Sequence, residues 1–313
     1  MKEQHNCPHT AESLAMLQAL SLNEKVFESR LRIAEWVEHY GEDNVYVAFS
    51  GGKDSTVLLD LVRRDYPSVP AVFCDTGLEF PEIRDFVKTI DNVTWVKPAM
   101  NFKAVIEKYG YPVVSKEQAM AISRYRNTND PMQKYYRTHG FPNGKKGMIS
   151  KKWQYLIDAP FKISERCCNV MKKNPLKAYE KNSGNMPMIG VMASESDMRT
   201  RNYLDYGCNA FETKSPQSRP VMFWSDSDIW EYLKTKSIPY SSIYDMGYSR
   251  TGCAFCAFGA HLECTPNRFQ RMQDTHPRLW TYCMDKLGMR EVLKECNVPI
   301  EDNQMYLELG EEE

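Results

Sequence analysis

Long apolar runs, an apolar segment near the start and a net charge of either sign are all missing from this 313-residue sequence. No stretch of eighteen apolar residues occurs, so no membrane-spanning helix and no membrane partner are predicted. Residues 1–6 lack the apolar core of a secretion signal, which favours a cytoplasmic location. Forty basic and forty-one acidic residues leave a net charge of −1, so the field of the whole chain does not draw it to nucleic acid. Internal repeats, the signature of solenoids and propellers, are also missing.

Cysteine, in contrast, is plentiful, since the chain has ten. Disulfides do not persist in the cytosol, so this number points to metal binding or redox chemistry. Four cysteines fall into two pairs: the adjacent Cys167 and Cys168, and later Cys253 and Cys256 in a Cys-x-x-Cys spacing. Four thiolates in two pairs suit either one structural zinc ion or a four-iron cluster, and a Cys-x-x-Cys pair alone also suits a redox dithiol.

The other cysteines show no metal-ligand spacing. Cys74 lies in an apolar run and is expected to be a small core residue, the usual place of a free cysteine. Cys296, in the string Lys-Glu-Cys-Asn, is expected to be a cysteine at the end of a helix.

The chain is organised around a glycine-rich stretch at residues 46–59. Residues 45–49 form an apolar, β-branched and aromatic run that predicts a buried strand, and residues 56–62 show helical spacing, with Ser55 or Asp54 as the expected cap. Between them lie Ser50, Gly51, Gly52, Lys53, Asp54 and Ser55. Glycines let backbone N–H groups turn inward, and the helix N-terminus adds partial positive charge, so this loop is suited to hold an anion. The alternative is a glycine-rich turn without a ligand.

Strands and helices alternate on both sides of this loop. Helices are predicted at residues 22–40, 81–87, 102–109 and 226–236, and strands at 71–74, 93–96 and 186–192; the core pattern returns at 220–223. This alternation predicts an α/β fold with a doubly wound parallel sheet, in which ligands bind beyond the carboxyl ends of the strands. The predicted organisation is an N-terminal helix (1–41), a sheet domain (42–260) with an insertion (111–160), and a helical C-terminal region (261–313).

The insertion is basic and aromatic. Residues 127–160 are polar and rich in turn formers, and they interleave lysines and arginines with Tyr135, Tyr136, Phe141, Trp153 and Tyr155. Such a pattern suits phosphate binding and base stacking, so a nucleic-acid acceptor is one interpretation. The other is a solvated insertion whose aromatic side chains pack on the domain beneath.

Taken together, these motifs resemble a known superfamily. The loop at residues 50–55 is similar to the SGGxDS loop of the PP-loop ATP pyrophosphatases. The Cys-Cys and Gly-Cys-x-x-Cys strings, with Asp75-Thr76-Gly77, resemble the phosphoadenylylsulfate (PAPS) reductase superfamily over residues 44–260. The resemblance implies a Rossmann-like fold of the adenine nucleotide α-hydrolase type. It also implies a 4Fe-4S cluster on Cys167, Cys168, Cys253 and Cys256.

Two departures favour one branch of that superfamily. The sulfonucleotide reductases have a degenerate glycine loop and a Glu-Cys-Gly-φ-His tail, whereas this chain keeps the full loop and has Asn297 after Cys296. Both features resemble the cluster-containing sulfur transferases of the DNA phosphorothioation type. The resemblance therefore implies an enzyme that uses ATP and Mg²⁺ and releases AMP. The alternatives are a sulfonucleotide reductase that forms sulfite, and a nucleotide-binding regulatory or defence protein without turnover, with a partner protein or a second copy of itself.

The resemblance also assigns roles to residues. Ser50, Gly51, Gly52, Ser55 and Thr56 would hold phosphates, Lys53 would neutralise the leaving pyrophosphate, and Asp54 would position Mg²⁺. Asp75 and Thr76, after the second strand, would support the metal or the adenosine. The stretch from Gly190 to Arg201 resembles the substrate loop of the family, in which Arg199 and Arg201 would bind phosphate or sulfate in bidentate fashion. The alternative for these arginines is a solvated position after a strand.

Overall fold

A computed structural model describes residues 9–300 as two compact units. The first, here called the sheet unit, comprises residues 9–75, 80–97 and 175–251; the second, the helical unit, comprises 76–79, 98–174 and 252–300. Each unit is assembled from three separate segments of the chain. The linear domain boundaries expected from the sequence therefore stay a prediction.

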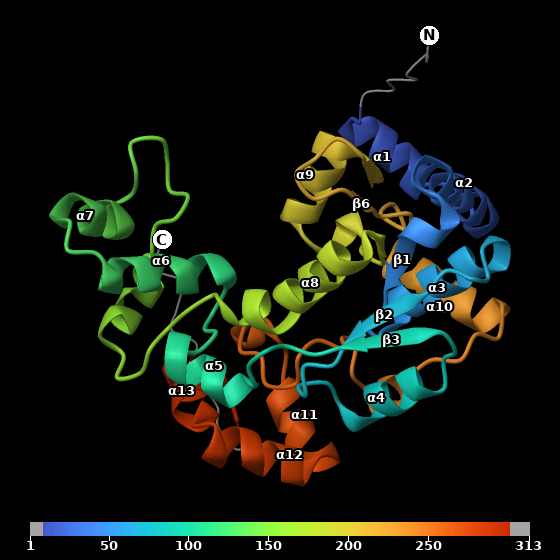
Figure 1. Cartoon of the computed structure of the whole chain (residues 1–313). Coiled ribbons are helices and arrows are strands. Elements are labelled where there is room, and N and C mark those ends of the chain that lie inside the picture. The colour runs from blue at the N-terminus through green and yellow to red at the C-terminus, as the bar shows by residue number, and fades with distance from the viewer. Residues whose placement is uncertain (1–8, 301–313) are drawn as a thin grey trace. The chain divides into compact units, whose positions relative to one another are not determined.

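All six strands lie in the sheet unit and form one sheet in the order β3-β2-β1-β4-β6-β5 (Figure 1). They are β1 (Val45–Ala48), β2 (Ala71–Cys74), β3 (Val93–Val96), β4 (Met186–Ile189), β5 (Asn209–Ala210) and β6 (Gln217–Ser218). Five strands are parallel, and only the edge strand β5 runs antiparallel to its neighbour β6. The chain moves outward from β1 to β3 and then returns to the other side of β1 with β4. The predicted doubly wound parallel sheet is confirmed, and its switch point lies between β1 and β4.

The apolar residues of β1 account for its central position in the sheet. Val45, Tyr46 and Val47 of β1 are all buried, as expected for a parallel strand that is covered on both faces. Helix α3 (Lys53–Asp65) begins directly after the glycine loop. The expected cap at Ser55 or Asp54 is wrong, because the N-cap is Gly52, which provides no capping side chain. Instead, the N–H of Lys53 donates a hydrogen bond of 2.8 Å to the hydroxyl of Tyr244.

The remaining helices of the sheet unit surround the sheet. Ser21 and Ser225 cap α2 and α10 with reciprocal capping boxes, which confirms the predicted cap at Ser225. Residues 220–223 are buried as expected but form a turn, in which the Pro220 carbonyl accepts a hydrogen bond from Ser29 of α2. These helices are α1 (Ala11–Gln18), α2 (Leu22–Tyr40), α4 (Pro81–Lys88), α8 (Asn174–Ser183), α9 (Asp197–Tyr206) and α10 (Asp226–Thr235).

The helical unit contains α5 (Phe102–Tyr109), α6 (Lys116–Asn127), α7 (Pro131–His139), α11 (Arg268–Thr275), α12 (Pro277–Thr281) and α13 (Met289–Glu295). The expectation of a turn-rich stretch at residues 127–160 is wrong in part, because this stretch forms α7 and a 3₁₀ helix at Lys151–Asp158. The missed signal for α7 was local: Asp130 caps the helix and Pro131 occupies its first turn. The helices predicted beyond residue 266 are present, and the acidic tail at 301–313 lies outside the described residues.

Between residues 9 and 300, no helix combines the length and the apolar character that crossing a bilayer requires.

Candidate functional site

The glycine loop forms a tight, internally bonded turn at the switch point of the sheet. The backbone N–H of Ser50 donates to the hydroxyl of Ser55 (3.1 Å), and the hydroxyls of Ser55 and Thr56 donate to the Gly52 carbonyl at 2.9 and 3.0 Å. Gly51, Gly52, Ser55 and Thr56 are buried, whereas Ser50 is exposed. The N–H groups in the first turn of α3 take no capping side chain from Gly52. This helix N-terminus therefore retains its partial positive charge for an anion.

Lys53 is the buried cation of this loop. Its side chain is 5 % exposed, and its ammonium lies 2.9 Å from Asp54 Oδ1 and 2.5 Å from Asp226 Oδ1. Burial by itself would lower the pKa of Lys53, but the carboxylates of Asp54 and Asp226 outweigh this effect and raise the pKa. Lys53 therefore carries a full positive charge at neutral pH. Together with the helix N-terminus, it makes the loop suitable for a polyanionic ligand.

Gly190 brings the end of β4 against the start of α3. A Cβ atom at Gly190 would lie 2.8 Å from the Asp54 carbonyl oxygen and 3.0 Å from Ser55 Cα, so only glycine fits this approach. The loop after β4 and the glycine loop are thereby held in direct contact within the sheet unit.

Arg199 and Arg201 lie on α9, which follows this contact. Arg199 pairs with Glu195, and burial lowers the pKa of Arg199, as does the charge of Arg250, whereas Asp54 raises it. Asp54 and Arg199 are therefore close enough to interact. Arg201 is exposed, and no ion pair involves its guanidinium within residues 9–300. The structure thus brings Arg199, but not Arg201, to the glycine loop.

Four residues at this site were not found from the sequence: Asp226, Tyr244, Arg250 and Thr251. The hydroxyl of Tyr244 lies 3.2 Å from that of Thr251, and burial raises the pKa of Tyr244, so it stays a neutral hydrogen-bonding group. Arg250 adds a second guanidinium near Arg199. These residues lie at least 170 positions after the loop, and no local pattern connects them with it. Only the proximity of residues 226–251 to the loop reveals them.

The structure places Asp75 and Thr76 in different units. Asp75 is buried at the end of β2, and one of its carboxylate oxygens accepts a hydrogen bond of 3.1 Å from Arg84 of α4. Thr76 belongs to the helical unit, where its N–H and hydroxyl both donate to the carboxylate of Glu79, at 3.0 and 2.7 Å. Their proposed support of metal or adenosine stays a prediction.

The four paired cysteines lie close together in the helical unit. Cys167 and Cys168 begin a helical segment that continues as a π-helix at Asn169–Lys173, a distortion often found at functional sites. Burial, and then the charges of the three other cysteines, raise the pKa of Cys167. Burial likewise raises the pKa of Cys256 to about 11, and Cys253 and Cys168 contribute. The described residues form no disulfide, so these thiols are available as ligands.

Positive groups offset the charge that this quartet would carry as thiolates. Lys172 is close to Cys253, Cys168 and Glu79: burial lowers its pKa, but these neighbours outweigh burial and raise it. Its ammonium lies 3.9 Å from Glu79 Oε1. The Ala254 N–H donates to the Leu78 carbonyl at 2.8 Å, which ties the Cys253 loop to the segment that carries Glu79. The site is therefore prepared for an anionic centre.

Four cysteines offer the donor set of either a single metal ion or a multinuclear cluster. Within the described residues, no three histidine, cysteine or carboxylate side chains form a group that could hold one metal ion. A structural zinc ion requires its sulfur ligands about 2.3 Å from one point. In a four-iron cluster each thiolate binds its own iron, so the sulfurs are spread more widely. The four thiols interact with one another, and such a group can serve either arrangement.

The other described cysteines have ordinary structural positions. Cys74 lies in β2 as expected, but it is half-buried and not the fully buried core residue that the sequence predicted. Cys296 caps the end of α13 and is fully buried, as predicted for a cysteine at a helix end. Burial raises the pKa of Cys296 to about 12, which makes it a poor nucleophile at neutral pH.

Comparison with known proteins identifies the family. The phosphoadenosine phosphosulfate reductase domain matches residues 44–258, well over half of the chain. The chain belongs to this family. An adenosine 5′-phosphosulfate reductase of Geobacillus kaustophilus is 27% identical over 233 residues, which cover 72% of this chain and 78% of the relative. An uncharacterized protein of Methanocaldococcus jannaschii is 25% identical over 247 residues, which cover 78% of this chain but 47% of that protein.

Solved structures are similar at a lower level. The phosphoadenylyl-sulfate reductase of Candida auris, in complex with phosphate, has a TM-score of 0.42 and 16% identity, covering 78% of this chain and 95% of that one. The U34-tRNA thiolase NcsA of Methanococcus maripaludis, with its [4Fe-4S] cluster, has a TM-score of 0.35 and 13% identity, covering 91% of this chain and 84% of that one. The family assignment rests on the domain match and not on these structures.

Proposed function

We propose that this member of the PAPS reductase family is an ATP-dependent, AMP-forming enzyme of sulfur transfer that carries a 4Fe-4S cluster. The observation that carries the proposal is the intact glycine loop, with a buried, charged Lys53 at a helix N-terminus whose N-cap residue, Gly52, supplies no capping side chain. A triphosphate gains more from this arrangement than a sulfonucleotide does, because it places more negative charge at the loop. Magnesium would be held by Asp54 and by the phosphates themselves, as is usual for Mg²⁺ with nucleotides.

Residues of the sheet unit have separate roles in this reaction. The N–H groups at the start of α3, apart from that of Lys53, bind the β and γ phosphates. The Lys53 ammonium stabilises the charge that develops on pyrophosphate as the bond between the α-phosphorus and the bridging oxygen breaks. Arg199 orients the α-phosphate while an oxygen of the acceptor attacks the α-phosphorus. A sulfide-level donor then replaces the adenylated oxygen, so that AMP leaves and a carbon–sulfur or phosphorus–sulfur bond forms. Tyr244 holds the first turn of α3 in place through the Lys53 N–H.

Cys167, Cys168, Cys253 and Cys256 would hold the cluster, and Lys172 would balance its charge. When bound, the cluster supplies a site to which sulfur can attach and a local electrostatic field. The proximity of the four thiols supports this assignment, as does their position, since Cys167 is buried and the other three are half-buried.

The second candidate is a sulfonucleotide reductase, which the names of the curated relatives favour. That reaction needs an accessible nucleophilic cysteine near the end of the chain. Cys296 is buried with a raised pKa, which argues against this role in this chain. A regulatory protein that binds nucleotide without turnover is the third candidate.

Nucleotide preference tests the proposal. Anaerobically reconstituted protein with Mg²⁺ is expected to bind ATP at least about tenfold more tightly than adenylylsulfate in isothermal titration, the equivalent of about 1.4 kcal/mol. With acceptor and sulfide present, AMP and pyrophosphate should form in equal amounts. Sulfite release from adenylylsulfate with thioredoxin, abolished in Cys296→Ser, would instead establish the reductase. Tight ATP binding without product under any acceptor would establish the regulatory protein.

A further inference from the structure

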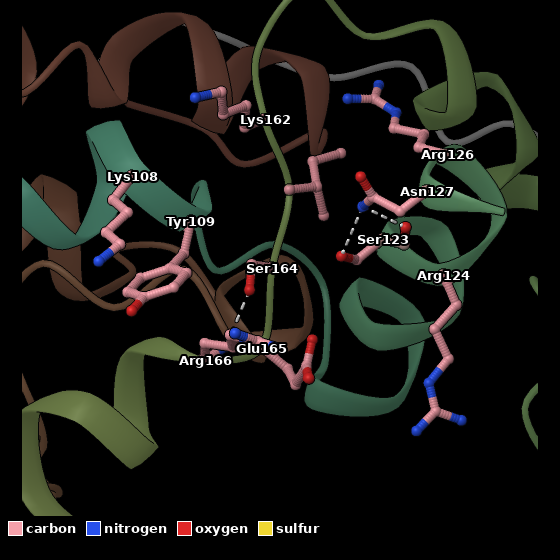
Figure 2. Close-up of a pocket in the computed structure, with 11 residues that line it drawn as sticks. Lys108, Tyr109, Ser123, Arg124, Arg126, Asn127, Lys162, Ser164, Glu165 and Arg166 are labelled. Carbon is pink, nitrogen blue, oxygen red and sulfur yellow. Dashed lines mark hydrogen bonds between the residues drawn. The ribbon is translucent and has the colours of Figure 1, made fainter.

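A pocket of about 660 Å³ lies in the helical unit, and the proposed chemistry does not use it (Figure 2). Three short segments form its walls: the end of α5, the second half of α6, and residues 162–166. In Figure 2 the side chains of Lys108, Arg124 and Lys162 come from these three separate segments. The pocket is therefore lined by basic side chains from segments that are distant in the sequence.

The backbone holds these walls in place. Tyr111 and Ile163 form a parallel bridge, in which the Tyr111 N–H donates to the Lys162 carbonyl (2.8 Å) and the Ser164 N–H to the Tyr111 carbonyl (3.0 Å). Gly110 has φ +111°, and a Cβ atom there would lie 2.5 Å from the Lys162 carbonyl carbon, so only glycine permits this approach. The segment at 162–164 is thus fixed beside the end of α5.

Positive charge dominates the lining. Lys108, Arg124, Lys162 and Arg166 are all exposed, while Glu165 is the single acidic residue among the lining residues. Lys108 and Arg166 both lie over the ring of Tyr109, at 5.3 and 5.4 Å from its centroid. Arg126 does not contribute to binding, because its guanidinium donates to four backbone carbonyls, those of Leu156, Ile157, Ala159 and Phe161. The Lys162 ammonium donates to one carbonyl, that of Glu107 (3.0 Å), and so keeps two of its three N–H donors for a ligand.

A second pocket of about 540 Å³ adjoins the first and shares Arg124 and Glu165 with it. It adds Lys116, Lys146 and Arg137, and one further carboxylate, Glu117, which accepts a hydrogen bond from the Gly147 N–H. Burial lowers the pKa of Arg137, and the charge of Arg124 lowers it further. In the described part of the chain, no ion pair joins Arg124 or Arg137 to a carboxylate. Arg124 and Arg137 therefore both line the second pocket without a carboxylate partner, although the buried Arg137 also donates to the Gly147 carbonyl at 2.8 Å.

The sequence shows that this charge is concentrated in one region. Residues 98–174 contain fifteen lysines and arginines against five acidic residues, a net charge of +10. The rest of the chain then carries 25 basic and 36 acidic residues, a net charge of −11, within the total of −1. Eight basic and two acidic side chains line the two pockets, a net charge of +6, which exceeds what one free nucleotide can neutralise. It matches a polymer with a phosphate at every unit.

Exposed aromatic rings lie on α7, which packs against α6 and also carries Arg137. Tyr135 is 54% exposed, and its ring stacks on that of His139 with 4.3 Å between centroids. Unpaired bases stack on such rings, whereas paired bases in a duplex present no free face.

We propose that this face of the helical unit binds a single-stranded segment of nucleic acid, with phosphates in the two pockets and bases on the rings of α7. Its role as the sulfur acceptor rests on the proposed function, but strand binding by itself does not. The surface is centred on residues 108–147 and 162–166, so it extends beyond the 127–160 stretch singled out in the sequence.

Fluorescence anisotropy with fluorescein-labelled 20-nucleotide single strands of RNA and of DNA tests this inference. The double variant Arg124→Ala/Lys162→Ala of the full chain is expected to bind at least about tenfold more weakly than the wild type. Its log Kd against log salt slope should fall by about 1.4, because two phosphate contacts are lost. The matched control, Lys177→Ala/Lys181→Ala, removes two exposed charges from α8 in the sheet unit and should bind within about twofold of the wild type. Tyr135→Ala should also weaken binding, whereas Tyr135→Phe should not.

Several outcomes would overturn the proposal. Equal weakening in the pocket variant and the α8 control would mean nonspecific attraction by total charge. Full displacement of the strand by 1 mM ATP or inorganic phosphate at constant ionic strength would mean a small-anion site. Tighter binding of a duplex than of either single strand would exclude base stacking. The variant Lys53→Met separates the two proposals. It is expected to lose ATP turnover and to keep strand binding, so a failure of the proposed reaction and a failure of this inference can be told apart.

Discussion

At the scale of the single residue, Lys53 connects the glycine loop to α10 through its ion pairs with Asp54 and Asp226. The Lys53 side chain is buried, and its ammonium lies between the carboxylates of Asp54 and Asp226. In the proposed reaction this ammonium faces the leaving pyrophosphate. Lys53→Met is expected to reduce AMP formation at least about a hundredfold, the loss that follows removal of a group that stabilises developing charge. Initial rates of pyrophosphate release measure the effect.

Stability provides the control for this substitution. Water can solvate Asp226, which is 64% exposed, once Lys53 is removed, but Asp54 is only 25% exposed and also loses its cation, so the free energy of unfolding should fall by about 1–3 kcal/mol. Lys88→Met breaks an exposed ion pair with Asp85 and should change neither rate nor stability by a measurable amount. A Lys53→Met protein that is folded and fully active would remove Lys53 from the mechanism.

At the scale of the element, a buried ion pair joins α2 to α10. Lys25 Nζ lies 2.7 Å from Asp228 Oδ2, and the same carboxylate completes the capping box of Ser225. Burial raises the pKa of Asp228, but hydrogen bonds from Lys25 and Ser225 outweigh burial and lower it below 3.8. The pair therefore contributes its full stability above about pH 4 and loses it as pH falls through the lowered pKa.

Lys25→Met should accordingly lower the free energy of unfolding by about 1–3 kcal/mol at pH 7, because it leaves a half-buried carboxylate without its cation. The difference from wild type should shrink as pH falls below 3.8, the ordinary pKa of an aspartate. Urea unfolding at pH 7 and pH 3 measures both values. A deficit that is the same at both pH values would show that lost packing of the lysine chain, and not the ion pair, causes it.

Gly190 sets how closely β4 and α3 approach. Gly190→Ala would place a methyl group 2.8 Å from the Asp54 carbonyl oxygen, so the first turn of α3 must move. ATP affinity should fall about tenfold or more because the N–H groups of that turn lose their alignment. Titration calorimetry measures the change. Gly252→Ala, where a new Cβ meets nothing within 4 Å, is the matched control and should bind ATP as the wild type does.

At the scale of the whole molecule, the cysteine quartet belongs to the helical unit and the glycine loop to the sheet unit. Cys253→Ser should reduce iron from about four atoms per chain to a small fraction and remove the broad visible absorption of the cluster. Cys264→Ser, a matched change at an exposed cysteine outside the quartet, should keep both. ATP binding in the sheet unit should survive in each variant. One zinc atom per chain and no colour in the wild type would contradict the cluster.

The sequence predicted an element correctly where the residues that determine it are close together in the chain. The strand at 45–48 and the following helix could be predicted because a parallel strand needs a continuous apolar run and the turn after it needs glycine. The helix at 131–139 was not predicted, because the polar composition of this stretch is typical of turns. Its start is nevertheless marked by Asp130 and Pro131. The predicted cap of α3 was wrong because the Lys53 N–H at the start of this helix donates to the hydroxyl of Tyr244, which lies 191 positions further along the chain.

By itself, the sequence determined the glycine loop between strand and helix, the two cysteine pairs and the order of strands and helices, because each depends on residues within about a dozen positions of one another. Only the tertiary structure decided which carboxylates hold Lys53, that Cys296 is shut away from solvent, and that Lys108, Arg124 and Lys162 share one pocket. Those outcomes depend on long-range packing, which positions side chains through the sum of many weak contacts that leave no mark on any short stretch of sequence.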